Sequence, residues 1–197
     1  MINENFVFLA VLLNLIGSGS YLIDTIRGKV KPNKVTWLLW AIAPLVAFFA
    51  QISQGVGISA LMTFSVGFLP LLIFLASFVN KKSQWQITRF DLVCGAFSIM
   101  GLLAWYLTNV GNIAIVFSII ADALAALPTI IKSYNEPESE SSFAFLLASI
   151  GTLITLLSIQ NWDFANAGFL LYILFANVLI FCLIYFKFKQ RKTSYIK

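Results

Sequence analysis

The sequence predicts an all-α membrane protein with seven transmembrane helices, and three observations support this. The first is composition: 60% of the 197 residues are hydrophobic and 11% are charged, whereas a soluble domain is about half apolar and a quarter charged. The second is the length of the apolar runs, and the third is the position of the basic residues. The composition argues against a soluble globular enzyme and against a disordered chain.

Seven apolar stretches are long enough to cross a bilayer, which takes about 20 mostly apolar residues. They cover residues 6–26, 35–52, 57–79, 90–108, 112–131, 142–159 and 164–186. The runs are continuous, whereas the strands of a membrane barrel alternate polar and apolar residues, so we expect helices. The first five residues are acidic rather than basic, unlike a signal peptide, and we expect the first helix to be retained.

All thirteen Lys and Arg fall on one side of this arrangement. They occupy the connections 27–34, 80–89 and 132–141 and the tail after Phe186. The opposite side has none: the N-terminus and the connections near 53–56, 109–111 and 160–163. Cytoplasmic loops are enriched in Lys and Arg, so we expect an outside N-terminus and a cytoplasmic C-terminus in a bacterial-type inner or plasma membrane. The net charge of +5 then reflects topology, and no nucleic-acid partner is expected.

Polar positions on the first and fifth helices indicate an internal repeat. The first helix carries Asn14, Ser18, Tyr21 and Thr25 on one helical face. The fifth carries, 104 residues later, Ser118, Asp122, Ala125 and Thr129. A hydroxyl-aromatic pair follows each copy, Thr36-Trp37 and Ser142-Phe143, and a separation of 107 aligns Pro70 with Asn177. One helix separates the copies, so both have the same orientation, as in transporters built from parallel repeats.

The predicted organisation follows from this repeat. Residues 1–80 form the first three-helix repeat, 81–110 a linker helix, 111–187 the second repeat and 188–197 a cytoplasmic tail. The arrangement resembles the PQ-loop superfamily, which includes SWEET sugar transporters, cystinosin-type carriers and the KDEL receptor. The resemblance rests on this plan and on Ala126-Leu127-Pro128-Thr129-Ile130-Ile131-Lys132, where Thr129 stands in place of the usual Gln.

The resemblance implies a SWEET-like bundle with a central cavity and alternating access. It also implies that Asn177, and less closely Trp162, contacts the solute. In this superfamily prolines bend the helices so that the two halves can rock. Pro44 and Pro128 match that role, with Gly151 and Asp24 at the repeat-related positions.

Asp122 is the main candidate for chemistry, because it lies near the middle of the fifth predicted helix. An ionised Asp at a helix centre costs about 2.5–3.5 kcal/mol, so such residues usually face a cavity or a partner. The predicted solute- or proton-binding set is Asp122, Asn177, Asn14, Ser18, Tyr21, Ser118 and Trp162. A purely structural hydrogen bond between helices is the alternative for Asp122.

We expect an inner gate and hinges within the helices. Their predicted members are Pro128, Thr129, Asp24, Thr25, Pro44 and Gly151. For Asp24 we expect a solvated helix end, and pairing with Arg27 or Lys132 as an inner gate is the alternative. We expect a solvated connection around Glu136, Glu138 and Glu140, and a membrane-surface position for Trp37 and Trp162.

The chain has no His, and its two Cys are isolated in apolar runs, so we expect no metal site and no cofactor. No catalytic motif favours an enzyme. The function expected is a secondary transporter for a small polar solute such as a sugar, an amino acid or a vitamin-like molecule, either proton-coupled or facilitative. The alternative is a PQ-loop receptor or sorting-type membrane protein that binds a ligand without transporting it. The expected partners are lipid and solute, and nothing in the sequence indicates an oligomer.

Overall fold

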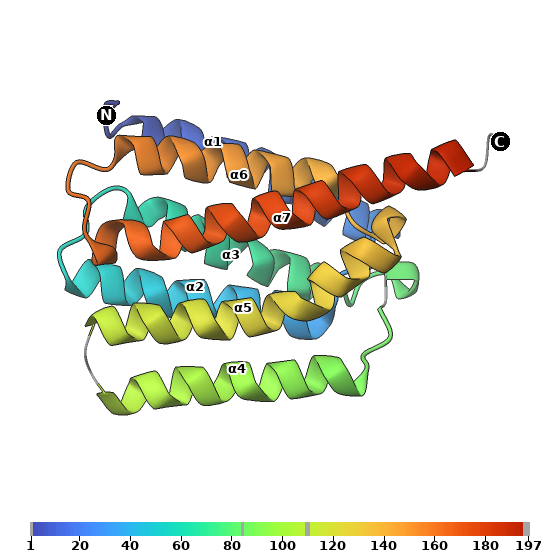
Figure 1. The fold of residues 1–197 in the computed structure, drawn as a ribbon, viewed down its shortest axis with the longest axis horizontal. Coiled ribbons are helices and arrows are strands. Elements are labelled where there is room, and N and C mark those ends of the chain that lie inside the picture. Colours follow the sequence, from blue (N-terminus) through green and yellow to red (C-terminus); the bar gives the residue numbers. More distant parts are fainter. Residues whose placement is uncertain (1, 84, 109–110, 195–197) are drawn as a thin grey trace.

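The computed structural model describes residues 2–83, 85–108 and 111–194, and these form an all-helical bundle (Figure 1). Its seven α-helices are α1 Phe6–Arg27, α2 Lys34–Ser53, α3 Ala60–Ala76, α4 Arg89–Thr108, α5 Gly111–Asn135, α6 Ser142–Ser158 and α7 Phe164–Ser194. Two short 3-10 helices are η1 Lys81–Ser83 and η2 Pro137–Ser139. The expected all-α class is confirmed. α7 continues through most of the predicted tail, because its polar end simply prolongs the helix beyond the bundle.

Within the described part of the chain, four helices are long and apolar enough to cross a membrane by length and composition: α1, α2, α5 and residues Phe164–Lys187 of α7. α3 and α6 are shorter apolar helices of 17 residues each. At 1.5 Å per residue, 17 residues extend about 26 Å, slightly less than a typical hydrocarbon core of about 30 Å.

The bundle carries apolar side chains outside and polar side chains inside. Phe8, Phe49 and Phe175 are 57%, 65% and 69% exposed. The buried polar residues include Asn14, Thr25, Thr36, Gln51, Thr63, Ser118, Asp122, Thr129, Thr152 and Thr155. A soluble protein shows the opposite distribution, and an apolar exterior of this extent matches a lipid environment. The chain is therefore a helical membrane protein.

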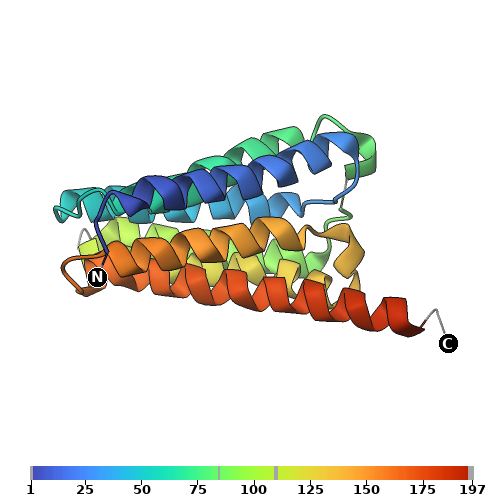
Figure 2. The ribbon, with the colours of Figure 1, turned by 90° about the horizontal axis from the view of Figure 1, so that it is seen from above.

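The helices pack as two groups of three beside α4. α1 and α2 both pack on α3, while α5 and α6 both pack on α7. The groups meet where α1 packs on α6 and α2 packs on α5. α4 packs on α5 and also contacts α2 (Figure 1). Figure 2 shows α1 and α3 on one side of the bundle and α6 and α7 on the other.

The contact between α1 and α6 depends on small residues. A Cβ on Gly151 would lie 2.6 Å from the Ala10 carbonyl oxygen, and one on Gly17 would lie 3.0 Å from Leu147 Cβ. Small residues let membrane helices approach closely and increase van der Waals contact. This close packing requires a small residue at Gly151, and its predicted role as a hinge stays a prediction.

Local sequence signals determine where the first helices end and begin. α1 stops at Gly28, whose φ of 77° is left-handed and whose N–H bonds to the Thr25 carbonyl. Asn33 then caps α2 by accepting hydrogen bonds from the N–H groups of Val35 and Thr36. The resulting connection lies at the end of the bundle shared by the α3–α4 and α5–α6 connections, which we call the basic end.

Prolines interrupt backbone hydrogen bonding inside three helices. Pro44, Pro70 and Pro128 lie within α2, α3 and α5, and all three are buried. Proline has no N–H and bends a helix, and α5 changes direction in its second half (Figure 1). Near Pro128, the Thr36 hydroxyl donates to the Ala125 carbonyl at 2.8 Å, which links α2 to α5 at this bend.

Candidate functional site

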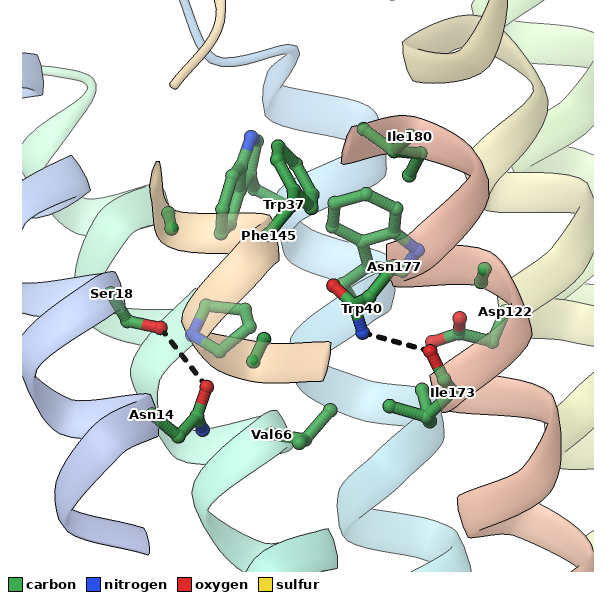
Figure 3. A pocket seen from close by; sticks show the side chains of 14 residues that line it. Asn14, Ser18, Trp37, Trp40, Val66, Asp122, Phe145, Ile173, Asn177 and Ile180 are labelled. Carbon is green, nitrogen blue, oxygen red and sulfur yellow. Dashed lines mark hydrogen bonds between the residues drawn. The ribbon is translucent and has the colours of Figure 1, made fainter. Parts of the chain in front are cut away.

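A cavity of about 60 Å³ lies between the two groups of helices, lined by side chains from six of them. The volume is enough for roughly four water molecules. Its polar and aromatic lining consists of Asn14, Ser18, Asp122, Asn177, Trp37, Trp40 and Phe145. Its other lining residues are Val66, Pro70, Ala144, Ala148, Ile173, Ala176 and Ile180. Figure 3 shows Asn14 and Ser18 on one side of the cavity and Asp122 and Asn177 on the opposite side.

Only one of the two carboxyl oxygens of Asp122 has a hydrogen-bond partner among the described residues. The residue is 2% exposed, and its Oδ2 accepts a hydrogen bond from the Tyr172 hydroxyl at 2.7 Å. Its Oδ1 is buried without a hydrogen-bond partner in the described part of the chain. Burying an unpaired carboxyl group is expensive, so Asp122 can take up a proton or a hydrogen-bond donor from a solute.

The amide groups of the cavity are held by their own helices and neighbours. Asn14 Nδ2 donates to Ser65 Oγ at 3.0 Å, and Asn14 Oδ1 accepts from Ser18 Oγ at 3.5 Å. Asn177 Nδ2 donates to the Ile173 carbonyl at 2.9 Å, one turn earlier in α7. The structure therefore brings four members of the predicted binding set, Asn14, Ser18, Asp122 and Asn177, to one cavity.

Three other members of that set lie elsewhere. Ser118 is fully buried one turn before Asp122, and its hydroxyl has no hydrogen-bond partner within the described residues. Tyr21 is fully buried nearer the basic end. Trp162 is 56% exposed in the connection between α6 and α7 and does not line the cavity. Its exposed ring matches the expected membrane-surface position better than a solute contact.

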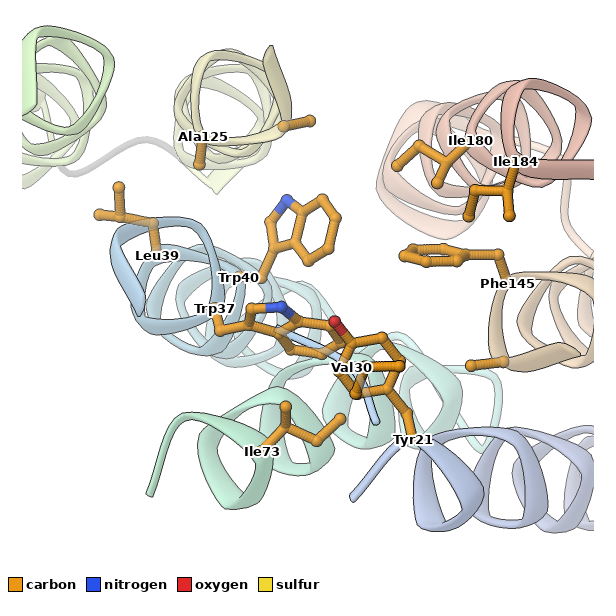
Figure 4. Close-up of a cluster of buried hydrophobic side chains, with 12 residues drawn as sticks. Tyr21, Val30, Trp37, Leu39, Trp40, Ile73, Ala125, Phe145, Ile180 and Ile184 are labelled. Carbon is orange, nitrogen blue, oxygen red and sulfur yellow. The ribbon is translucent and has the colours of Figure 1, made fainter. Parts of the chain in front are cut away.

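A cluster of four aromatic rings packs beside the cavity (Figure 4). Ring centroids are 4.6 Å apart between Tyr21 and Trp37, and 5.4 Å between Trp37 and Trp40. Phe145 is the fourth ring, and its centroid lies 6.2 Å from that of Trp40 and 6.5 Å from that of Tyr21. Trp37 does not anchor its helix in the lipid headgroups as expected, because it is 5% exposed and packs inside the bundle. Sequence alone gave no sign that the Trp37 and Trp40 side of α2 faces inward.

A buried ion pair lies at the basic end. The side chains of Lys132 and Glu140 are both fully buried, with Lys132 Nζ 2.6 Å from Glu140 Oε1. Glu140 Oε2 accepts a hydrogen bond from the Tyr21 hydroxyl at 2.7 Å. Lys132 Nζ also donates to the Lys31 carbonyl and lies 4.8 Å from the ring centre of Trp85. We call Tyr21, Lys132 and Glu140 the basic-end cluster.

The basic end bears on two expectations about acidic residues. Glu140 was expected in a solvated connection, but the α5–α6 connection folds inward and buries it. Asp24 is partly exposed and pairs with the exposed Lys29 at 3.4 Å, which fits the expected solvated helix end better than the alternative pairing with Arg27 or Lys132. Helical spacing could have located Lys132, because the buried positions 118, 122, 125 and 129 continue to 132. No comparable signal marks Glu140, which lies outside the regular helices.

The remaining gate and hinge candidates are buried in α1, α2 and α5. Thr25 is buried, and its hydroxyl donates to the Tyr21 carbonyl at 2.9 Å. Thr129 is fully buried on α5 between Asp122 and Lys132, and Pro128 precedes it. Pro44 is buried in α2, and the role of these residues as a gate stays a prediction.

No family model matches the chain, and neither the comparison with curated proteins nor that with solved structures finds a match. Within the described residues, no group of three or more His, Cys, Asp or Glu side chains is placed to hold a metal ion. Functional inference therefore rests on the cavity and on the helices around it.

Proposed function

We propose that the protein is a secondary transporter that moves a small polar solute by alternating access. Asp122 would bind the solute or a proton in the cavity between two rocking three-helix repeats. The observation that carries this proposal is a half-satisfied carboxyl group in the wall of a cavity that both halves of the chain line. Intramembrane carboxyl groups of this kind commonly mark ion, proton or solute paths.

The cavity lining supports the parallel repeat on which this mechanism depends. At a separation of 104 residues, Ser18 corresponds to Asp122, and both line the cavity. At 107, Pro70 corresponds to Asn177, and these line it too. The first residues of α2 and α6, Lys34 and Ser142, differ by 108. A separation of 108 residues pairs Trp37 with Phe145 and Trp40 with Ala148, and all four line the cavity. The comparison of the two hydroxyl-aromatic pairs in the sequence instead aligns Trp37 with Phe143.

The helix contacts support the same symmetry. Exchanging α1, α2 and α3 with α5, α6 and α7 turns the contact of α1 with α6 into the contact of α5 with α2. It also turns the packing of α1 and α2 on α3 into that of α5 and α6 on α7. Two such halves can rock against each other about a site on their shared axis, as in other repeat-based transporters.

Charge supports the proposed orientation, with the basic end in the cytoplasm. The described basic residues lie at the end of the bundle with the α1–α2, α3–α4 and α5–α6 connections, or at the far end of α7. The positive-inside rule then gives an outside N-terminus.

The closed basic end supports a gate there. The basic-end cluster and its neighbours cross between the halves, because Tyr21 belongs to the first half and Glu140 to the second. The Lys31 N–H, in the first half, donates to the Ser139 carbonyl at 3.1 Å. Opening the cavity toward the basic end therefore requires these bonds to break, together with the contacts of Tyr21 and Trp37 with the other rings.

The test is uptake into proteoliposomes that contain the purified protein. We expect saturable uptake of at least one member of a panel of sugars, amino acids, nucleosides and small amines, and its loss in Asp122→Asn. Asp163→Asn is the matched control, because Asp163 lies outside the cavity and caps α7, where Asn substitutes well. Saturable binding without uptake would instead support the receptor-type alternative.

Proton coupling has a separate test in the same vesicles. Among the described residues, the titratable group in contact with Asp122 is the Tyr172 hydroxyl on α7. Trp40 of α2 lines the same cavity. If Asp122 exchanges a proton with the solute, uptake of the wild type should depend on pH, and Tyr172→Phe should keep that dependence. A pH profile that Asp122→Asn leaves unchanged in shape would contradict coupling through this residue.

A further inference from the structure

We infer, building on the proposed transport function, that the solute is a small organic cation. It would carry an ammonium or quaternary ammonium group together with a hydrogen-bond acceptor. The inference rests on three features of the cavity as its described residues form it: a single carboxyl group, an aromatic side and an indole N–H without a hydrogen-bond partner.

The charge of the cavity favours a cation. Among the described residues that line the cavity, Asp122 is the only charged one, and no described Lys or Arg pairs with it. Lys132 is on the same helix but ten residues away, about 15 Å along the axis, and it is engaged by Glu140 and the Lys31 carbonyl. An anionic solute would meet a like charge without compensation, whereas a cation would neutralise a buried carboxylate.

The geometry at Asp122 leaves one oxygen for the solute. The Tyr172 hydroxyl donates a hydrogen bond to Oδ2, and Oδ1 has no partner in the described residues. An ammonium group bound at Oδ1 would form a charge-assisted hydrogen bond, and a quaternary ammonium would form an ion pair.

The aromatic side favours an organic cation over a metal ion. Trp37, Trp40 and Phe145 line the cavity, and Tyr21 packs against Trp37 and Phe145. Aromatic rings, Trp above all, attract organic cations within about 6 Å of the ring centre, and aromatic cages bind quaternary ammonium groups. Trp40 Nε1 is buried without a hydrogen-bond partner among the described residues, so a solute that also offers an oxygen acceptor would satisfy it.

The experiment compares isosteric ligands that differ only in charge. Choline and its uncharged isostere 3,3-dimethylbutan-1-ol are titrated against the purified protein in nanodiscs by calorimetry. Tetramethylammonium, 2-phenylethylammonium, glucose and glutamate complete the panel. We expect at least one cation to bind saturably and roughly tenfold or more tightly than its neutral counterpart. Asp122→Asn should remove that difference, Trp40→Leu should reduce it, and Asp163→Asn should leave it unchanged.

The outcomes separate this inference from the transport proposal. A cation that binds in an Asp122-dependent way but does not enter proteoliposomes supports the cation site and contradicts transport. Uptake of a neutral solute that depends on Asp122, with no preference for any cation over its isostere, supports transport and overturns the cation site. A preference for cations that Asp122→Asn retains would also overturn it.

Discussion

The basic-end cluster makes the most quantitative prediction. Glu140→Gln removes the carboxylate from a fully buried Lys132 while keeping the size of the side chain. Removing one partner of a buried ion pair typically costs about 3–5 kcal/mol, because the remaining charge stays buried without compensation. With roughly 2–4 °C per kcal/mol for a chain of this size, the melting temperature should fall by roughly 10 °C.

The assay is thermal unfolding in detergent, combined with a double-mutant cycle. Lys132→Met should destabilise the protein to a similar extent, because it leaves Glu140 buried and unpaired. The double variant Lys132→Met/Glu140→Gln should recover most of the loss, since an uncharged pair avoids the desolvation of both ions. Glu136→Gln is the control: Glu136 is an exposed carboxylate in the same connection, and exposed substitutions usually change stability by about 0.5 kcal/mol or less.

Two results would refute this reasoning. One is a loss in Glu140→Gln no larger than that in Glu136→Gln, which would mean that Glu140 is solvated as the sequence suggested. The other is strict additivity of the two single variants, since residues in direct contact should show a coupling energy.

Three further predictions follow from local packing and capping. Gly151→Ala should destabilise the protein by about 1–3 kcal/mol because its Cβ would meet backbone, while Gly19→Ala, with open space around it, should be neutral or stabilising in thermal unfolding. Thr36→Val should lower the free energy of unfolding by about 1–3 kcal/mol, because it removes the buried hydrogen bond to the Ala125 carbonyl near the α5 bend. A loss of stability no larger than that in Glu136→Gln would contradict this. Hydrogen bonds from the backbone and side chain of Asn166 lower the pKa of Asp163. The capping contribution should therefore be complete above the unfolded pKa of about 4 and be lost as pH falls through the lower folded value; equal acid sensitivity in Asp163→Ala would contradict it.

Most of the fold could be predicted because the membrane makes the pattern simple. A spanning helix must be apolar along its length, so the predicted range 35–52 differs by only one residue at each end from α2. The end of α7 could not be predicted in this way, since a polar helix that continues into water has no hydropathy signal distinct from a tail.

Part of the site could be predicted from helical spacing. Asn14, Ser18 and Asp122 fall on buried faces because polar groups in a membrane helix turn away from lipid. Glu140 could not be found, because a connection that folds back into the bundle carries the same composition as a solvated one.

The aromatic lining was missed for another reason. Tryptophan has two frequent positions in membrane proteins, the interface and the interior, and sequence does not distinguish them for Trp37. The inward direction of its side chain follows from the rotation of α2, which its packing against α3 and α5 determines.

The central claim is that the cavity opens to each side of the membrane in turn. The most direct measurement is thiol accessibility of Ser18→Cys in a background with Cys94 and Cys182 replaced, using a membrane-impermeant reagent applied from either side. Labelling should occur from both sides, and adding Glu140→Gln should speed it from the basic end and slow it from the opposite end. Labelling from one side alone, unaffected by Glu140→Gln, would contradict alternating access.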